Sequence, residues 1–154
     1  MTTDNLDYQS LKDMLIRHEG VKSTAYHDSL GYPTVGIGHL ITTTDTIEVG
    51  DTISDGHLQR LFDNDLDSKI ADCHKLYTNF PNFPQPVKEA LINMMFNLGY
   101  TQMSCFHGFN DTVNREDWGV VADFLRNNFK RWYMQVGLRA VDVENMFRQA
   151  ARGI

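Results

Sequence analysis

Hydrophobic residues recur at helical spacing through most of the chain and alternate over only one short region. The first periodic stretch predicts a helix over residues 6–19 that stops at Gly20. Its apolar side consists of Tyr8, Leu11, Met14, Leu15 and His18. A short β region is expected from about Ala25 to Ile53, with turns at "DSLGYP" and "EVGD".

A long helix over about residues 54–77 is expected next, with Ser54 as its N-cap. One side of this helix is apolar and the other is acidic, so the acidic side is expected to face water. The apolar side carries Leu58, Leu61, Phe62, Leu66, Ile70, Cys73 and Tyr77. A helix of this length that follows a small sheet is typical of a connection between two lobes.

The remainder of the chain is expected to be helical. Pro86 suits a first helical turn, and "VKEALINMMFNLG" is apolar on nearly all sides, which indicates a buried helix ended by Gly99. Shorter helices are expected from about Phe106, behind an Asn114 cap with Glu116 and Asp117, and near Arg131. A last helix is expected over about residues 138–152. The predicted class is therefore α+β, mostly helical with one small antiparallel sheet.

Length and composition suit one domain. We expect residues 1–154 to form it, with a small lobe at about 20–65, a helical lobe of 1–19 plus 78–154, and a connecting helix at about 54–77. Cys73 and Cys105 lack CxxC spacing and lie in apolar helical contexts, which favours two reduced, buried thiols. No apolar run approaches the ~18 residues of a membrane span, and "MTTDNLDYQ" does not resemble a signal peptide.

The net charge of −6 argues against a general nucleic-acid binder, because binding to a phosphate backbone needs clustered Lys and Arg. Residues 115–154 nevertheless carry 7 basic and 5 acidic side chains, against 7 and 15 in residues 1–114. The asymmetry is consistent with a mildly basic C-terminal face or with ordinary solvated surfaces. "DNDLD" at 63–67 lacks the glycine and glutamate of a calcium loop, so no metal or cofactor is expected.

Glycines interrupt the stretch "TVGIGH". Alternation as a strand would place Thr34, Gly36 and Gly38 on one face and Val35, Ile37 and His39 on the other. The first face would then be nearly bare, and a flat polymer such as a glycan chain could lie against it. A bulge or tight packing explains the two glycines equally well.

Two carboxylates flank this stretch. Glu19 lies at a helix C-terminus, where the dipole disfavours its charged form and so suits a proton donor. Asp28 opens the turn before Gly31, where aspartate is common for structural reasons alone. Taken singly, each residue is better explained as structural, and it is their combination with Thr34 that points to catalysis.

Five segments together resemble the phage-type lysozyme family of glycoside hydrolases (family 24). They are "EG" at 19–20, "AYHDSLGYPTVGIGH" at 25–39, "LFDNDL" at 61–66, "ALINMMFNLG" at 90–99 and "RWYMQ" at 131–135. The resemblance covers nearly the whole chain in the right order. It implies a lysozyme-like fold whose small lobe and helical C-terminal lobe are joined by a long helix.

The resemblance also implies roles for individual residues. Glu19 would be the general acid, and Asp28 and Thr34 would hold the attacking water, as in an inverting hydrolase with carboxyl groups about 6.5–9.5 Å apart. Arg139 would approach the catalytic glutamate, and His39 and Asp65 would form a supporting ion pair. Substrate would be contacted at Leu40, Phe96 and Asn97, in addition to the bare strand at Gly36 and Gly38. The T-even phage member has glutamine at the position of Asn97 and an acidic residue at that of His18, so these contacts are expected to differ.

The implied function is that of an endolysin, a hydrolase of the β-1,4 bond between N-acetylmuramic acid and N-acetylglucosamine in peptidoglycan. Two alternatives remain open: a non-catalytic wall-binding or virion structural protein with the same fold, and a lytic transglycosylase. We expect a monomer without membrane anchor or nucleic-acid partner. It is expected to wait in the host cytoplasm until a separate membrane-permeabilising protein gives it access to the wall.

Overall fold

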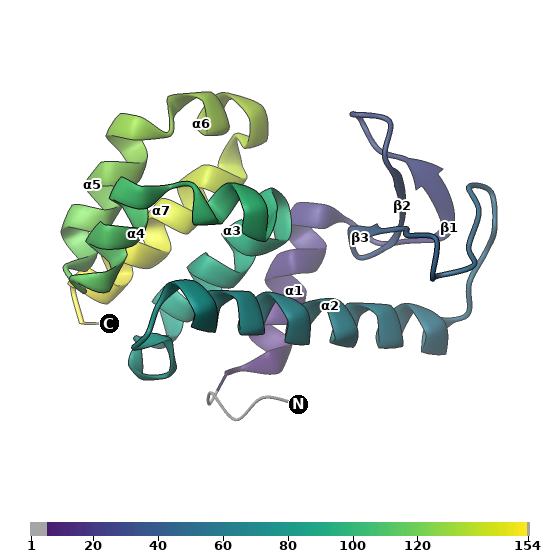
Figure 1. The fold of residues 1–154 in the computed structure, drawn as a ribbon, viewed down its shortest axis with the longest axis horizontal. Helices are drawn as coiled ribbons and strands as arrows, with labels where there is room; N and C mark the ends of the chain where they lie inside the picture. The colour runs from purple at the N-terminus through teal and green to yellow at the C-terminus, as the bar shows by residue number, and fades with distance from the viewer. Residues whose placement is uncertain (1–5, 154) are drawn as a thin grey trace. The chain divides into compact units, whose positions relative to one another are not determined.

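A computed structural model of the chain describes residues 6–153 (Figure 1). Its helices are α1 (Tyr8–Glu19), α2 (Asp55–Leu76), α3 (Gln85–Ser104), α4 (His107–Asn114), α5 (Trp118–Asn128), α6 (Lys130–Val136) and α7 (Leu138–Ala151), with a 3₁₀ turn η1 (Phe80–Asn82). Its strands are β1 (Lys22–His27), β2 (Pro33–Gly36) and β3 (His39–Leu40). The predicted α+β class is confirmed. No helix in this described range is both long and apolar enough to cross a membrane.

Contacts along the chain group it into two compact units that divide after Ser68. The sheet unit is Tyr8–Ser68, and the helical unit comprises the rest of the described chain, residues 6–7 and 69–153. The expected single domain with lobes at 20–65 and at 1–19 plus 78–154 stays a prediction. Residues 1–5, which include most of the segment inspected for a signal peptide, lie outside the described residues.

The sheet unit is built on three antiparallel strands in the order β1, β2, β3. Strand β1 pairs with β2, with Tyr26 opposite Thr34, and β2 pairs with β3, with Thr34 opposite Leu40. Side chains from the strands, the following loop and α2 form a small apolar core beneath the sheet. The core contains Ala25, Val35, Ile53 and Leu61, flanked by Ile41, Ile47 and Leu58.

The predicted continuous strand from Thr34 to His39 is wrong. β2 ends at Gly36, and the chain reverses so that Val35 pairs with His39. The reversal requires positive φ angles, +66° at Gly36 and +64° at Gly38, which residues other than glycine rarely adopt. The two glycines do not form one bare strand face. They serve close packing, which was one of the alternatives above, and a hairpin connection, which the sequence analysis did not predict.

Helix α1 begins and ends close to its predicted bounds, and two of its side chains form hydrogen bonds with α2. Gly20 ends α1 with a φ of +76°. The Tyr8 hydroxyl donates a hydrogen bond to Asp63, and Lys12 donates one to Gln59. The predicted N-cap of α2 is also confirmed, because the Ser54 hydroxyl oxygen accepts the His57 amide at 3.1 Å.

The helical unit has α3 at its centre. Residues 87–95 of α3 are all buried, as expected for a helix with apolar residues on nearly all sides. The helix continues to Ser104, but Gly99 has non-helical angles (φ 79°, ψ 162°), so the predicted break falls at the right residue. The expectation for the thiols is half right, since neither forms a disulfide, but Cys105 is exposed and only Cys73 is buried. Cys105 follows the last residue of α3, where the chain turns at the surface.

The predicted N-cap of α5 is wrong. Asn114 is the last residue of α4, and its amide donates to the carbonyl of Leu76. Asp117 caps α5 by accepting the amide of Val120 at 3.4 Å. Asn and Asp cap helices equally well, and the choice falls on Asp117 because the chain turns at Glu116, which has a positive φ of 60°.

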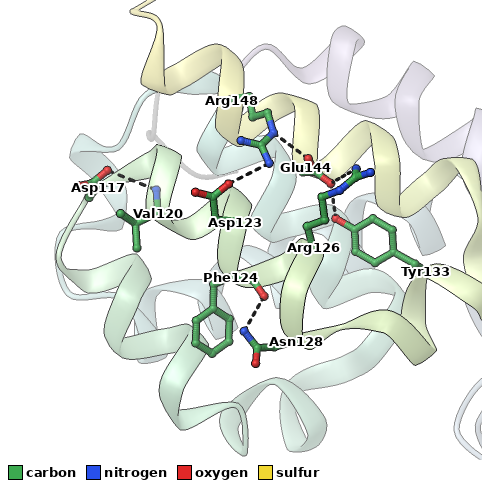
Figure 2. A network of polar contacts seen from close by, with 9 residues as sticks. All are labelled: Asp117, Val120, Asp123, Phe124, Arg126, Asn128, Tyr133, Glu144 and Arg148. Carbon is green, nitrogen blue, oxygen red and sulfur yellow. Dashed lines mark hydrogen bonds and ion pairs between the residues drawn. The ribbon is translucent and has the colours of Figure 1, made fainter.

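A buried carboxylate ties three helices of the helical unit together (Figure 2). Glu144 on α7 accepts hydrogen bonds from the Tyr133 hydroxyl at 2.7 Å and from Arg148 Nε at 2.7 Å, and Arg126 lies at 3.4 Å. Burial alone raises the pKa of Glu144, but the donors Tyr133 and Arg148 outweigh it and lower the pKa below its ordinary value. The charged carboxylate is therefore the form that stabilises this unit.

We expect Glu144→Gln to lower the free energy of unfolding by about 1–3 kcal/mol at neutral pH, since two donors lose a charged acceptor. A glutamate whose pKa is lowered by folding stabilises the folded state at pH values above its ordinary pKa, and this stabilisation is lost as the pH falls. The difference in unfolding free energy between the variant and the wild type should therefore shrink below about pH 4. Denaturant unfolding at several pH values measures this. Asp123→Asn is the control, because Asp123 is 64% exposed and its ion pair with Arg148 should contribute less than about 1 kcal/mol. Equal effects of the two variants would contradict the prediction.

Candidate active site

Glu19 is the last residue of α1, and its side chain packs on the β2–β3 turn. A Cβ added to Gly38 would lie 2.9 Å from both Cδ and Oε1 of Glu19. Real Cβ atoms do not approach other atoms so closely, so the carboxyl group occupies space that only glycine leaves open. The backbone of Gly38 thus forms one wall around the predicted proton donor.

Asp28 is fixed by its own turn. Its Oδ1 accepts the backbone amides of Leu30 at 2.9 Å and Tyr32 at 2.8 Å, and its own amide donates to the carbonyl of Tyr32 at 2.8 Å. The turn closes with Gly31, whose amide donates to the Asp28 carbonyl at 3.0 Å. Within the described chain both of these side-chain hydrogen bonds use Oδ1, so Oδ2 is the oxygen that can hold a water molecule.

Thr34 lies in the middle of the sheet and is 6% exposed. Its hydroxyl donates to the carbonyl of Tyr32 at 3.0 Å, which belongs to the turn that also holds Asp28. Since the hydroxyl proton is used in this way, the Thr34 oxygen can act as an acceptor toward a further group. The structure therefore brings Glu19, Asp28 and Thr34 into one unit of the chain, on α1, the β1–β2 turn and β2.

His39 forms the predicted ion pair with Asp65 and a second one that the sequence interpretation missed. Nδ1 lies 2.7 Å from Asp65 Oδ2, and Nε2 lies 2.8 Å from Asp45 Oδ2. Burial lowers the pKa of His39, but the hydrogen bonds and charges of Asp65 and Asp45 outweigh burial and raise it to about 9. The only sequence signal for Asp45 was its place after three threonines, where it accepts the amide of Thr42 in a short turn.

The predicted substrate and supporting residues outside this group have varied surroundings. Leu40 is 54% exposed on β3, and Phe96 is partly buried on α3. Asn97 is exposed, and its Oδ1 accepts the indole N–H of Trp132 at 2.7 Å. Arg139 is buried and donates from Nε to Asn93 Oδ1 at 2.7 Å. Their contacts with substrate, those of Gly36 and Gly38, and the approach of Arg139 to the glutamate stay predictions.

The sequence profile of phage lysozymes matches residues 16–148, a range that contains every candidate residue described above. The chain belongs to the phage lysozyme family. It is a lysozyme, a glycoside hydrolase that acts on peptidoglycan. Among residues 6–153 of this lysozyme, no group of three His, Cys, Asp or Glu side chains is placed to hold a metal ion.

Relatives of this lysozyme occur in an amoeba and in a phage. "Probable T4-type lysozyme 2" of Dictyostelium discoideum is 32% identical over 160 residues, covering 90% of this chain and 93% of the relative. "Probable T4-type lysozyme 1" of the same organism is 28% identical over 141 residues, covering 77% and 83%. The "Pre-baseplate central spike protein Gp5" of Enterobacteria phage T4 is 28% identical over 160 residues, which cover 90% of this chain and 27% of Gp5.

Replacing Gly38 tests whether the close contact with Glu19 positions that side chain. We expect Gly38→Ala to reduce lysozyme activity at least about tenfold, because the added methyl displaces the carboxyl group. Gly50→Ala is the matched control, since Gly50 also has a positive φ (97°) but no atom within 4 Å of an added Cβ. Both variants should lose roughly 1 kcal/mol of stability from backbone strain. Turbidity clearing of a cell-wall suspension measures the activity, and equal activities of the two variants would argue against the positioning role.

The double ion pair of His39 predicts a loss of stability at alkaline pH. A histidine whose pKa is raised by folding stabilises the folded state fully at pH values below its ordinary pKa of about 6.5. For His39 this stabilisation disappears as the pH rises through about 9. Relative to His39→Gln, the wild type should lose about 3 kcal/mol of unfolding free energy over this interval. Denaturant unfolding at intervals between about pH 6 and 10 checks the prediction. His107→Gln, at an exposed position, is the control, and its unfolding free energy should follow the same pH dependence as that of the wild type.

Proposed function

We propose that this lysozyme is an endolysin that hydrolyses the β-1,4 bond between N-acetylmuramic acid and N-acetylglucosamine with inversion. Glu19 is the general acid, and Asp28 and Thr34 hold the attacking water. The observation that carries the proposal is the packing of the Glu19 carboxyl against the Gly38 backbone, in the same unit as an aspartate with one carboxylate oxygen left to accept from a ligand.

The hydrogen bonds of Asp28 and Thr34 support the role in holding water. Asp28 Oδ2 and the Thr34 hydroxyl oxygen are both acceptors, because Oδ1 is occupied by amides and the hydroxyl proton by a carbonyl. A water molecule that donates its two hydrogens to them keeps a lone pair for the anomeric carbon. Asp28 must be ionised to remove the proton from this water as the bond to carbon forms.

Glu19 supplies the other half of the reaction. It enters protonated and transfers its proton to the glycosidic oxygen as the bond from carbon to that oxygen breaks. Water then replaces the leaving sugar from the opposite face, which inverts the anomeric carbon. For the next cycle the proton acquired by Asp28 is lost to solvent and Glu19 takes one up.

The biological role is part of the proposal. A phage lysozyme that reaches the wall at the end of infection would lyse the host, and we propose that the protein waits in the host cytoplasm until a separate protein permeabilises the membrane. Similarity to Gp5, a central spike protein by name, keeps a virion role as a second candidate. Hydrolysis of purified peptidoglycan is common to both roles, whereas a non-catalytic wall-binding protein would not show it.

We expect Glu19→Gln to fold normally and to lower peptidoglycan hydrolysis by at least about 100-fold, since a general acid contributes on the order of 10²–10⁴. Release of reducing sugar from purified peptidoglycan measures the rate. Glu48→Gln, an exposed glutamate of the same unit, is the matched control and should hydrolyse at the wild-type rate. Wild-type hydrolysis by Glu19→Gln would exclude the proposed acid.

The products distinguish the proposed reaction from that of a lytic transglycosylase. Hydrolysis leaves a free reducing muramic end, whereas a transglycosylase leaves an anhydro end that is lighter by one water, which mass spectrometry resolves. NMR of the first products should show the α-anomer, since inversion of a β bond forms it first. Anhydro ends would favour the transglycosylase, and the β-anomer would exclude inversion.

A further inference from the structure

Tyr26 lies beside the candidate catalytic group and has no role in the mechanism above. It is a partly buried residue of β1, two positions before Asp28, and its Cα pairs with that of Thr34 on β2. Directly paired residues of antiparallel strands project their side chains to the same face. The Tyr26 side chain therefore lies next to Thr34, one of the two residues predicted to hold the water.

A cation contacts this ring, and two carboxylates act on its hydroxyl. Lys22, on the same strand, places its ammonium group 4.3 Å from the ring centroid, a contact that favours one ring position. Glu19 at the end of α1 and Asp28 in the following turn are the two carboxylates whose charges act on the hydroxyl, while β2 contributes the uncharged Thr34. Burial, and then the charges of Glu19 and Asp28, raise the pKa of Tyr26, so it keeps its proton at neutral pH.

A protonated phenol can serve both carboxyl groups at once. Its O–H can donate a hydrogen bond to an ionised carboxylate, and its oxygen can accept one from a protonated carboxyl group. The proposed reaction needs Asp28 in the first state and Glu19 in the second. A single tyrosine hydroxyl can therefore favour opposite protonation states at its two neighbours.

On the basis of the proposed function, we infer that Tyr26 is a positioning residue whose hydroxyl donates toward ionised Asp28 and accepts from protonated Glu19, directly or through one water. Lys22 holds the ring in place for this role. Tyr26 thereby supports both members of the proposed catalytic pair.

The first test does not depend on measuring enzymatic activity. The Cζ resonance of Tyr26 in ¹³C-tyrosine-labelled protein, identified by its absence in Tyr26→Phe, is followed between about pH 3 and 8, where carboxyl groups titrate. It should show two inflections, one of which disappears in Glu19→Gln and the other in Asp28→Asn. A resonance that does not change with pH, or that both variants leave unchanged, would overturn the inference.

The second test is the pH profile of kcat for Tyr26→Phe. The variant removes a donor to the ionised aspartate and an acceptor from the protonated glutamate, so the profile of kcat against pH should narrow from both sides. We expect kcat to fall about tenfold at the optimum with KM unchanged, as for loss of one hydrogen bond to a charged group. An unchanged width, even with a lower kcat, would make Tyr26 merely structural and refute the inference.

Tyr100→Phe is the matched control, because Lys75 lies 5.0 Å from the Tyr100 ring centroid in the helical unit. Its profile should keep the wild-type width. Failure of the proposed function and failure of the role of Tyr26 give different results. Hydrolysis by Glu19→Gln at the wild-type rate would refute the proposed function, while the resonance of Tyr26 would still report whether both carboxyl groups are its neighbours.

Discussion

The contact between a helix end and a hairpin turn is the constraint on which the candidate site depends. Glu19 ends α1 because Gly20 takes a conformation that stops the helix, and its carboxyl group then packs on Gly38. A glycine at each position is required for a different reason, positive φ in the first case and both positive φ and missing volume in the second. The position of the predicted proton donor thus follows from two residues that carry no functional group.

The arrangement of the two residues proposed to hold water, Asp28 and Thr34, depends on a second local feature. Asp28 uses one carboxylate oxygen to close its turn, and Thr34 uses its hydroxyl proton to bond a carbonyl of the same turn. Ordinary turn chemistry accounts for these hydrogen bonds completely. What these hydrogen bonds leave over is one carboxylate oxygen of Asp28 and the hydroxyl oxygen of Thr34 as acceptors. The proposed catalytic role needs both acceptors together, so neither residue alone indicates it.

Helix positions could be predicted from the sequence because the signals are local. Gly20 and Ser54 mark helix ends, and Gly99 marks a break within α3, through their own backbone or side-chain chemistry. The strand at 34–39 could not be predicted correctly, because alternation of side chains does not reveal that two glycines have positive φ. Asp45 was missed because its contact with His39 depends on how the following loop folds back. The grouping of Glu19, Asp28 and Thr34 followed from their combination and the family resemblance, since each residue alone is commonplace.

The predicted acid, the aspartate and the threonine all belong to one uninterrupted part of the chain, Tyr8–Ser68. The contacts that fix these three residues, the packing of Glu19 on Gly38 and the hydrogen bonds of Asp28 and Thr34, are made within this segment. The proposed arrangement of acid and water is therefore set by the folding of one continuous stretch of chain. A substitution in the helical unit that leaves this stretch folded should leave the stereochemistry of the product unchanged.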